Sequence, residues 1–346
     1  MLDALPRPRL EDVAAAAGVS KSTASKVLGD APGTRVGERT RTRIREAARR
    51  LGYRPHGPAR LLATGRTGAV ALVGPSLSDP DWAAAVGGAT RRAALLGLAA
   101  LVVEDAGDDP PAHGSAALVD PDLVDGVLVG PGAAGAAEAL GFGRLPGVVL
   151  GEYGHPGWTD VPDRATEVAR GAVDFLAGLG HRRLGLIGRP ARRGGAGPDA
   201  FVRRCRELGL PEPVVTLQRA DERGGADGLA ELRRSRTAPS AVLTASFAQA
   251  VGVLGTAARL GLDVPGEVSV LAGGDCPAAD HLVPTLSTLA VPSAELGAVA
   301  VGALAAVLSG ADPRTAGRAA PAPMLTVRGS TGSSRAGSLS ELALFL

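Results

Sequence analysis

The sequence predicts two architectures in one chain: an N-terminal all-α head with a helix-turn-helix, and a two-lobed α/β body with parallel sheets. Residues 1–66 show the apolar spacing of short helices, whereas short apolar runs alternate with helical segments after Arg66. The charge divides at the same point. Residues 1–66 hold 14 Lys and Arg against 6 Asp and Glu, a net +8, and the remainder holds 23 against 29, a net −6. A chain of 346 residues has room for both parts.

Composition argues against several classes of protein. Aromatic residues make up only 3% of the chain, so a buried core has to be built mainly from Ala, Val and Leu. Cys205 and Cys276 are the only cysteines; they form no disulfide framework and stand in no metal-binding spacing, which favours a reducing compartment. The N-terminus lacks the features of an export signal, and the most apolar late stretch, residues 296–311, is shorter than the roughly 20 residues that span a bilayer. We therefore expect a cytoplasmic protein with no membrane segment, metal or cofactor.

Two short helices that meet at a glycine turn are predicted near the N-terminus. Residues 10–17 read LEDVAAAA, with acidic side chains in the first turn, where the helix dipole favours negative charge, and Gly18 ends this helix. Ser20 can cap a second helix at residues 21–28, in which apolar residues recur at helical spacing. In a helix-turn-helix the second helix lies in the major groove of DNA, and its early side chains reach base edges.

The outward positions of the second helix carry short polar or cationic side chains that can bond bases or phosphates. Lys21 and Lys26 are the only lysines in the chain. The alternative is a helix face that is merely solvated. A third helix at residues 40–51, with Gly52 as its end signal, completes the head. The candidate DNA contacts in the head are Ser20, Lys21, Ser22, Thr23, Ser25 and Lys26.

The motifs of the head resemble the N-terminus of lactose-repressor (LacI/GalR) regulators. The matching segments are LEDVAAAAGVSKSTASKVL, TRTRIREAARRLGYRP and ARLLATGRTGAVALVGP. The resemblance implies a DNA-binding head at 1–52 and a hinge at 53–66 that folds into a short helix on operator DNA. It places Ala59 and Leu62 at the positions that enter the minor groove, where a leucine can wedge between base pairs and kink the duplex. The alternative for Leu62 is a packed apolar residue in a linker.

After the head, eight apolar runs alternate with helical segments, which predicts parallel sheets with helices on both faces. A stretch rich in Gly and Pro at residues 151–160 divides them into two series, and therefore into two lobes with a cleft where strand ends meet. The runs are AVALVG, LAALVVE, DGVLVG and GVVLG, then RLGLIG, PVVTL, SAVLTAS and VSVLAG.

The family resemblance continues through GHRRLGLIG, GLDVPGEVSVLAG and LTVRGST, and so covers almost the whole chain. It implies a periplasmic-binding-protein-like body that senses a small-molecule effector and forms a homodimer. In such a body the final segments cross back, so each lobe is discontinuous. The implied bounds are 67–332 for the body, with lobe 1 at about 67–160 and 291–323, lobe 2 at about 161–290 and 324–332, and a tail at 333–346.

The effector positions depart from the family pattern. The resemblance puts Ser246 and Phe247 where an Asn-Asp pair is common, and Gly274 where an aspartate commonly binds sugar hydroxyls. Each lost hydrogen bond in a buried site costs roughly 1 to 3 kcal/mol, so polyols should bind poorly. We expect a different, more apolar effector, or a regulator with little effector control. Trp82 either stacks on a ligand or is a core or interface tryptophan. The candidate effector residues are Asp79, Trp82, Arg192, Ser246, Phe247 and Asp275.

An enzyme is the weakest of the alternatives. The chain has no lysine after Lys26, which excludes a GxxxxGK phosphate loop in the body, and it contains no HExxH or GxSxG. An extracytoplasmic solute-binding protein would share the body but needs an export signal in place of a basic head, and a constitutive DNA-binding regulator without an effector stays open. The resemblance implies a sequence-specific transcriptional regulator, a repressor by analogy, that binds double-stranded operator DNA.

Overall fold

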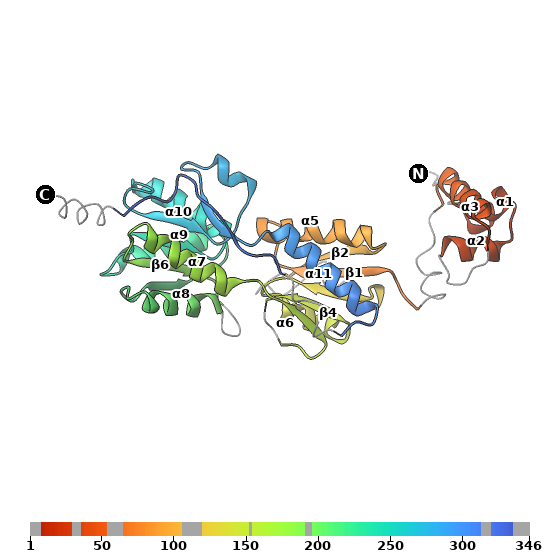
Figure 1. Ribbon diagram of the computed structural model, residues 1–346, viewed down its shortest axis with the longest axis horizontal. Coiled ribbons are helices and arrows are strands. Elements are labelled where there is room, and N and C mark those ends of the chain that lie inside the picture. The colour runs from red at the N-terminus through yellow and green to blue at the C-terminus, as the bar shows by residue number, and fades with distance from the viewer. Residues whose placement is uncertain are drawn as a thin grey trace, which may run out of the picture. The chain divides into compact units, whose positions relative to one another are not determined.

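The computed structural model describes residues 8–29, 36–53, 65–105, 120–151, 154–190, 196–312 and 320–334. The chain divides into two compact units, Met1–Gly68 and Ala69–Leu346, here termed the head and the body (Figure 1).

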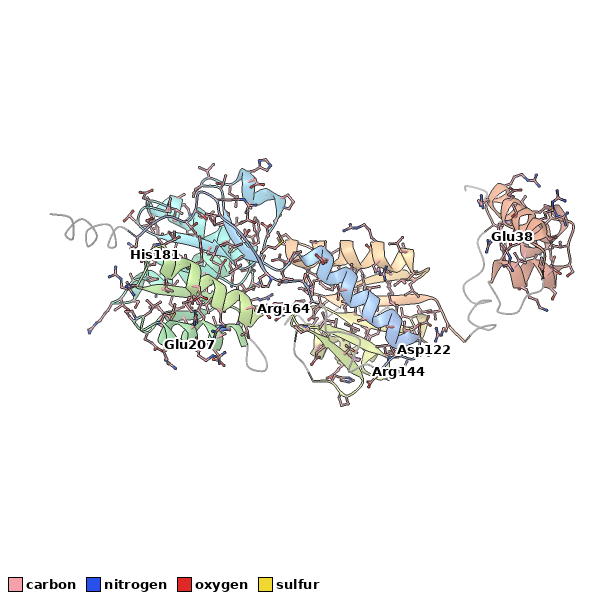
Figure 2. All side chains as sticks on the ribbon, viewed as in Figure 1. Glu38, Asp122, Arg144, Arg164, His181 and Glu207 are labelled. Carbon is pink, nitrogen blue, oxygen red and sulfur yellow. The ribbon has the colours of Figure 1, made fainter. Side chains whose placement is uncertain are left out.

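The head is a bundle of three helices around a small apolar core, which confirms the predicted helix-turn-helix. α3 begins two residues earlier than the predicted residue 40, because Gly37 is extended and Glu38 already takes the first helical position (Figure 2). The left-handed conformation of Gly52 (φ 66°) ends α3 where the sequence predicts an end. The core includes Val13 from α1, Ala24 and Val27 from α2, and Ile44 from α3, all fully buried. The helices are α1 (Leu10–Ala16), α2 (Lys21–Leu28) and α3 (Glu38–Leu51).

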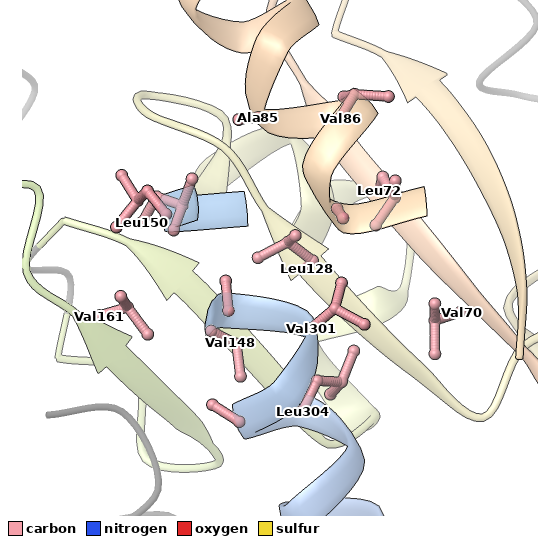
Figure 3. Packing of buried hydrophobic residues seen from close by; sticks show 14 of the residues in the cluster. Val70, Leu72, Ala85, Val86, Leu128, Val148, Leu150, Val161, Val301 and Leu304 are labelled. Carbon is pink, nitrogen blue, oxygen red and sulfur yellow. The ribbon is translucent and has the colours of Figure 1, made fainter. Parts of the chain in front are cut away.

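The first lobe is built on a parallel sheet with the strand order β2-β1-β3-β4-β5. Successive side chains of a strand point to opposite faces, so β1 sends Val70 and Leu72 to one face and Ala71 and Val73 to the other. α5 and α11 cover the first of these faces (Figure 3). α6 covers the second. The elements are β1 (Ala69–Gly74), α5 (Pro80–Leu95), β2 (Ala99–Glu104), η2 (Pro121–Leu123), β3 (Gly126–Val129), α6 (Ala134–Ala139), η3 (Phe142–Arg144), β4 (Gly147–Leu150), β5 (Trp158–Val161) and α11 (Ser293–Leu308).

The second lobe has a sheet with the order β11-β10-β9-β8-β6-β7, in which only the β10–β11 pair is antiparallel. α7 and α8 cover one face, and α9 and α10 cover the other. The elements are α7 (Ala165–Gly178), β6 (Leu184–Gly188), α8 (Ala196–Glu207), β7 (Val214–Leu217), α9 (Glu222–Arg234), β8 (Ala241–Thr244), α10 (Phe247–Leu260), β9 (Ser269–Ala272), η4 (Pro277–His281), β10 (Ser287–Ala290) and β11 (Met324–Thr326).

A buried histidine holds the chain segment around Gly332 against the second lobe. His181 Nε2 lies 3.0 Å from the carbonyl oxygen of Gly332, and Nδ1 lies 2.9 Å from Ser240 Oγ (Figure 2). Burial lowers the pKa of His181, so the neutral imidazole is favoured. This histidine therefore has a structural role within the second lobe.

The eight predicted runs all form strands, and three further strands, β5, β10 and β11, were not predicted; β5 lies in the stretch that the sequence analysis assigns to a break. Trp158–Val161 forms β5, and Trp158 is buried with the side chains of β4 and η3. The apolar stretch at 296–311 falls largely within α11, which follows β10 in the chain yet packs on the first lobe. Across the part of the chain that the structure describes, no helix is long and apolar enough to cross a membrane.

Candidate nucleic-acid interface and interlobe site

The start of α2 is fixed by local hydrogen bonds. Gly18 takes a left-handed conformation (φ 60°), and the N–H of Val19 donates to the carbonyl oxygen of Ala14 over 3.0 Å. Ser20 is the N-cap of α2: its Oγ accepts from the N–H of Thr23 over 3.1 Å. The turn therefore fixes the orientation of α2 relative to α1.

One face of α2 is exposed and polar, and the opposite face is buried. Ala24 and Val27 are fully buried, and Thr23 is half-buried at the edge. Four of the six predicted DNA contacts therefore lie on the exposed face of α2, whereas Ser20 caps the helix and Thr23 lies at the edge of the face. The exposed side chains of this face are Lys21, Ser22, Ser25 and Lys26.

Lys21 has a partner that the sequence prediction missed. Its Nζ lies 2.7 Å from Glu11 Oε1 on α1, and both side chains are largely exposed. The ammonium group lowers the pKa of the Glu11 carboxyl through this hydrogen bond. An exposed pair of this kind contributes little to stability, so phosphate oxygens can compete for Lys21. The acidic first turn of α1 was visible in the sequence, but its partner was not.

α3 also carries exposed basic side chains. Arg39, Arg43 and Arg49 are exposed, while Arg41 Nε lies 3.8 Å from Glu38 Oε2 within the same helix. Three further candidates, Ala59, Leu62 and Arg192, lie outside the described residues.

In the body, Asp79 and Trp82 both belong to the start of α5. Asp79 is the N-cap, and its Oδ1 accepts from the backbone N–H of Asp81 (3.0 Å) and Trp82 (3.3 Å). Trp82 is only 2% exposed, and a Cβ on Gly74 or Gly130 would lie 2.3 Å or 2.8 Å from its ring. The indole is therefore part of the core of the first lobe. Its Nε1 has no hydrogen-bond partner among the described residues, and contact with an effector stays a prediction.

Ser246 and Phe247 lie at the start of α10 and are engaged within the second lobe. Ser246 is the N-cap, its Oγ accepting from the N–H of Gln249 over 3.2 Å, and Phe247 packs in the lobe core. The fully buried amide of Gln249, which the sequence prediction missed, donates to the carbonyl oxygens of Gly188 and Arg219. Its signal was a polar residue within the apolar first turns of α10. These groups hold the ends of β6, β7 and β8 together.

Asp275 follows β9 and contacts the first lobe through its backbone. Its N–H donates to Asp81 Oδ1 over 3.2 Å, and the Oγ of Ser293 lies 3.3 Å from the same oxygen. Burial, followed by the charge of Asp79, raises the pKa of Asp81 to about 6; the hydrogen bond from Asp275, the charge of Arg189 and the hydrogen bond from Ser293 act in the opposite direction. Asp81 was not a sequence candidate. Within the described ranges, no group of three or more His, Cys, Asp and Glu side chains is arranged to hold a metal ion.

Comparison with known proteins explains this combination of head and body. Residues 9–56 match the family described as bacterial regulatory proteins, lacI family, and residues 173–331 match the periplasmic binding protein-like domain. The HTH-type transcriptional regulator reg1 of Streptomyces lividans is 32% identical, over 94% of this chain and 97% of that protein. The chain belongs to the LacI family. It is accordingly a sequence-specific DNA-binding transcriptional regulator, as the resemblance of its motifs implies.

Other relatives from the LacI family are also transcriptional regulators. MalR of Streptomyces coelicolor is 32% identical over 94% of the chain and 97% of that protein, and the repressor CytR of Escherichia coli K12 is 26% identical over 93% and 96%. These relatives are named as transcriptional regulators or repressors, and none as an enzyme, which confirms the rejection of catalysis.

Solved structures share the LacI-family fold. The lac repressor dimer bound to operator and the anti-inducer ONPF has a TM-score of 0.74 at 22% identity, covering 95% of this chain and 100% of that one. The complex of the transcriptional regulator CelR with cellobiose has a TM-score of 0.64 at 24% identity, covering 94% and 100%.

Proposed function

We propose that the outer face of α2 enters the major groove of operator DNA and that the chain acts as a repressor. The observation that carries this is the placement of Lys21, Ser22, Ser25 and Lys26 on one exposed face whose reverse side is buried. Hydroxyl and ammonium groups on a recognition helix bond base edges and phosphates. The basic charge of residues 1–66 supplies the accompanying attraction to the duplex.

We further propose the division into a head at 1–52, a hinge at 53–66 and a body at 67–332. The hinge is proposed to order on the operator, with Ala59 and Leu62 in the minor groove, where Leu62 would kink the duplex. The family resemblance supports these domain bounds and the proposed role of the hinge.

A small-molecule effector is proposed to bind between the two lobes and to change operator affinity, because its affinity differs between lobe arrangements. Two observations support the location: Asp79 and Asp275 follow strands of different lobes, and Asp81 already joins those lobes. CelR was solved with cellobiose and the lac repressor with ONPF, which supports a sugar-like ligand as one class. The replaced polar positions, Ser246 and Gly274 among them, favour a more apolar ligand.

The active form is proposed to be a cytoplasmic homodimer that reads a pseudo-palindromic operator. Two recognition helices related by a two-fold axis contact half-sites about one helical turn of DNA apart, or a multiple of it. The likeness to the lac repressor dimer supports this arrangement.

A regulator without effector control is the second candidate. The burial of Ser246 and Phe247, 2% and 5% exposed, favours it, because both side chains are already engaged inside the second lobe.

Selection of bound DNA from a random pool tests the proposed function. We expect the full chain to enrich one pseudo-palindromic sequence, and the selection repeated with sugars, polyols and nucleosides to show which ligand alters the binding. Enrichment without any ligand effect favours the second candidate. Failure to enrich any sequence would overturn both.

Two variants test the contacts. Lys26→Ala should lower the slope of log affinity against log salt by about 1, as expected for one lost phosphate contact. Arg144→Ala is the matched control, because Arg144 pairs with Asp122 in the body (2.7 Å; Figure 2). Leu62→Ala should weaken specific binding; unchanged operator affinity would refute the hinge proposal.

A further inference from the structure

Asp81 is a side chain of the first lobe that contacts the second lobe. It is the second residue of α5, and its Oδ1 accepts from the N–H of Asp275 in the loop after β9. The same oxygen lies 3.3 Å from Ser293 Oγ at the start of α11. One carboxyl oxygen therefore joins two segments of the fold that are remote from it in sequence.

The other oxygen of Asp81 occupies the space of a missing side chain. A Cβ built on Gly274 would lie 2.0 Å from Asp81 Oδ2 and 2.9 Å from the backbone nitrogen of Phe247, the first residue of α10. Real Cβ atoms essentially never come this close to another heavy atom. The Asp81 carboxyl and any side chain at position 274 would therefore occupy the same space. Only glycine at position 274 leaves this space free for Asp81.

The partner loop is anchored independently of Asp81. Arg328, which is mostly buried, places Nη1 3.7 Å from Asp275 Oδ1 and Nε 2.5 Å from Asp280 Oδ1. Its Nη1 also donates to the carbonyl oxygen of Leu286 over 2.8 Å. The second lobe therefore holds this loop by its own contacts, and the Asp275 N–H is available to a carboxyl from the other lobe.

We propose that Asp81, by docking at Gly274 and Asp275, is an intramolecular latch that holds the two lobes in the arrangement of this structure, here termed closed. This inference rests on the proposed function, because it concerns the same interlobe region and assigns its regulation to the chain's own carboxyl. The effector is then in competition with Asp81 for the space beside Gly274. A ligand group that takes the Asp275 N–H replaces the latch, whereas a ligand that binds elsewhere leaves it in place.

Gly274→Ala tests the latch by filling that volume. Hydrogen exchange of the Asp275 amide in the full chain should become about tenfold faster, the effect expected for loss of one hydrogen bond. The radius of gyration from small-angle scattering should increase as the lobes part. Gly255→Ala is the matched control: it lies in α10 of the same lobe, and its added Cβ would find only the end of Arg259 at 3.6 Å. Equal exchange and equal radius for the two variants would overturn the latch.

A double-mutant cycle separates the latch from strain inside the second lobe. Asp81→Ala alone should reproduce the faster exchange and the larger radius, and Gly274→Ala should add nothing in the Asp81→Ala background. Full additivity would mean that Gly274→Ala acts by crowding the Phe247 backbone, which would refute the proposed competition. Operator selection with the same samples keeps the two failures distinct: loss of the latch with specific DNA binding intact bears on this inference alone.

Discussion

Lys21 Nζ lies 2.7 Å from Glu11 Oε1, so the first cation of the recognition helix is paired with an acid on the preceding helix. The pair stands at the surface proposed to meet DNA, where a carboxylate repels phosphate and holds an ammonium away from it.

Removing this acid should strengthen DNA binding. Glu11→Gln is expected to raise operator affinity a few-fold at low salt, because Lys21 is released and a negative charge is lost next to the phosphates. Thermal stability should change little, because an exposed ion pair stabilises weakly. Asp122→Asn, which makes the same charge change in the body, controls for net charge. Weaker binding by Glu11→Gln would show instead that Glu11 positions Lys21 for its contact.

The N-cap of α2 should determine how well the recognition helix is formed. Ser20→Ala removes the acceptor for the Thr23 N–H and should cost about 1 kcal/mol of head stability. Hydrogen exchange of the α2 amides in the full chain measures this. Ser20→Thr keeps a hydroxyl acceptor and should restore most of the protection; equal loss in both variants would exclude the cap as the cause.

The Asp81 contact should respond to pH. Burial, followed by the charge of Asp79 on the same helix, raises the pKa of Asp81 from 3.8 to about 6. The stabilisation from its protonation is therefore complete below the ordinary pKa and is lost as the pH rises through about 6. The ratio of closed to open lobes should accordingly fall between about pH 4 and about pH 8. Scattering at a series of pH values checks this.

Asp81→Asn should remove that pH response. The charged neighbours of the carboxyl are Asp79 on its own helix and Arg189 after β6, with the Arg328–Asp275 pair behind the loop. A response of equal size in Asp81→Asn would assign the titration to one of these groups.

The close crossing of α5 and α11 should tolerate no methyl group. A Cβ on Gly88 would lie 1.7 Å from the carbonyl oxygen of Ala294, so Gly88→Ala forces the helices apart at a cost of about 1 to 3 kcal/mol. The neighbouring Gly87 has only the end of Arg91 at 3.5 Å, and Gly87→Ala should be neutral or stabilising. Thermal unfolding of both variants decides; similar midpoints would contradict the packing argument.

Local pattern predicted much of the fold, and long-range packing explains the rest. Each predicted strand is an apolar run next to turn residues, whereas β5 reads WTDV inside a Gly- and Pro-rich stretch and is recognisable only by its pairing with β4. The position of Trp82 could not be predicted either, because its ring packs against Gly74 at the end of β1 and Gly130 just after β3.

The candidate site divides in the same way. The face of α2 follows from helical spacing, so its residues were found together. Asp81 and Gly274 lie far apart in the sequence, and no helical or strand spacing relates them. From the sequence, Gly274 indicated only that the aspartate common in the family is missing at this position. What replaces that aspartate, a carboxyl from the other lobe, is visible only in three dimensions.

Because α11 packs on the first lobe but comes late in the chain, the core of that lobe is completed late in synthesis. β1, β3 and β4 leave the ribosome long before α11, yet Val301 and Leu304 of α11 complete the core over those strands (Figure 3). A nascent chain that ends before α11 carries a finished DNA-binding head on a lobe with an uncovered apolar face. An uncovered apolar face of this kind promotes aggregation, so we expect the first lobe to become stable only after α11 has been made.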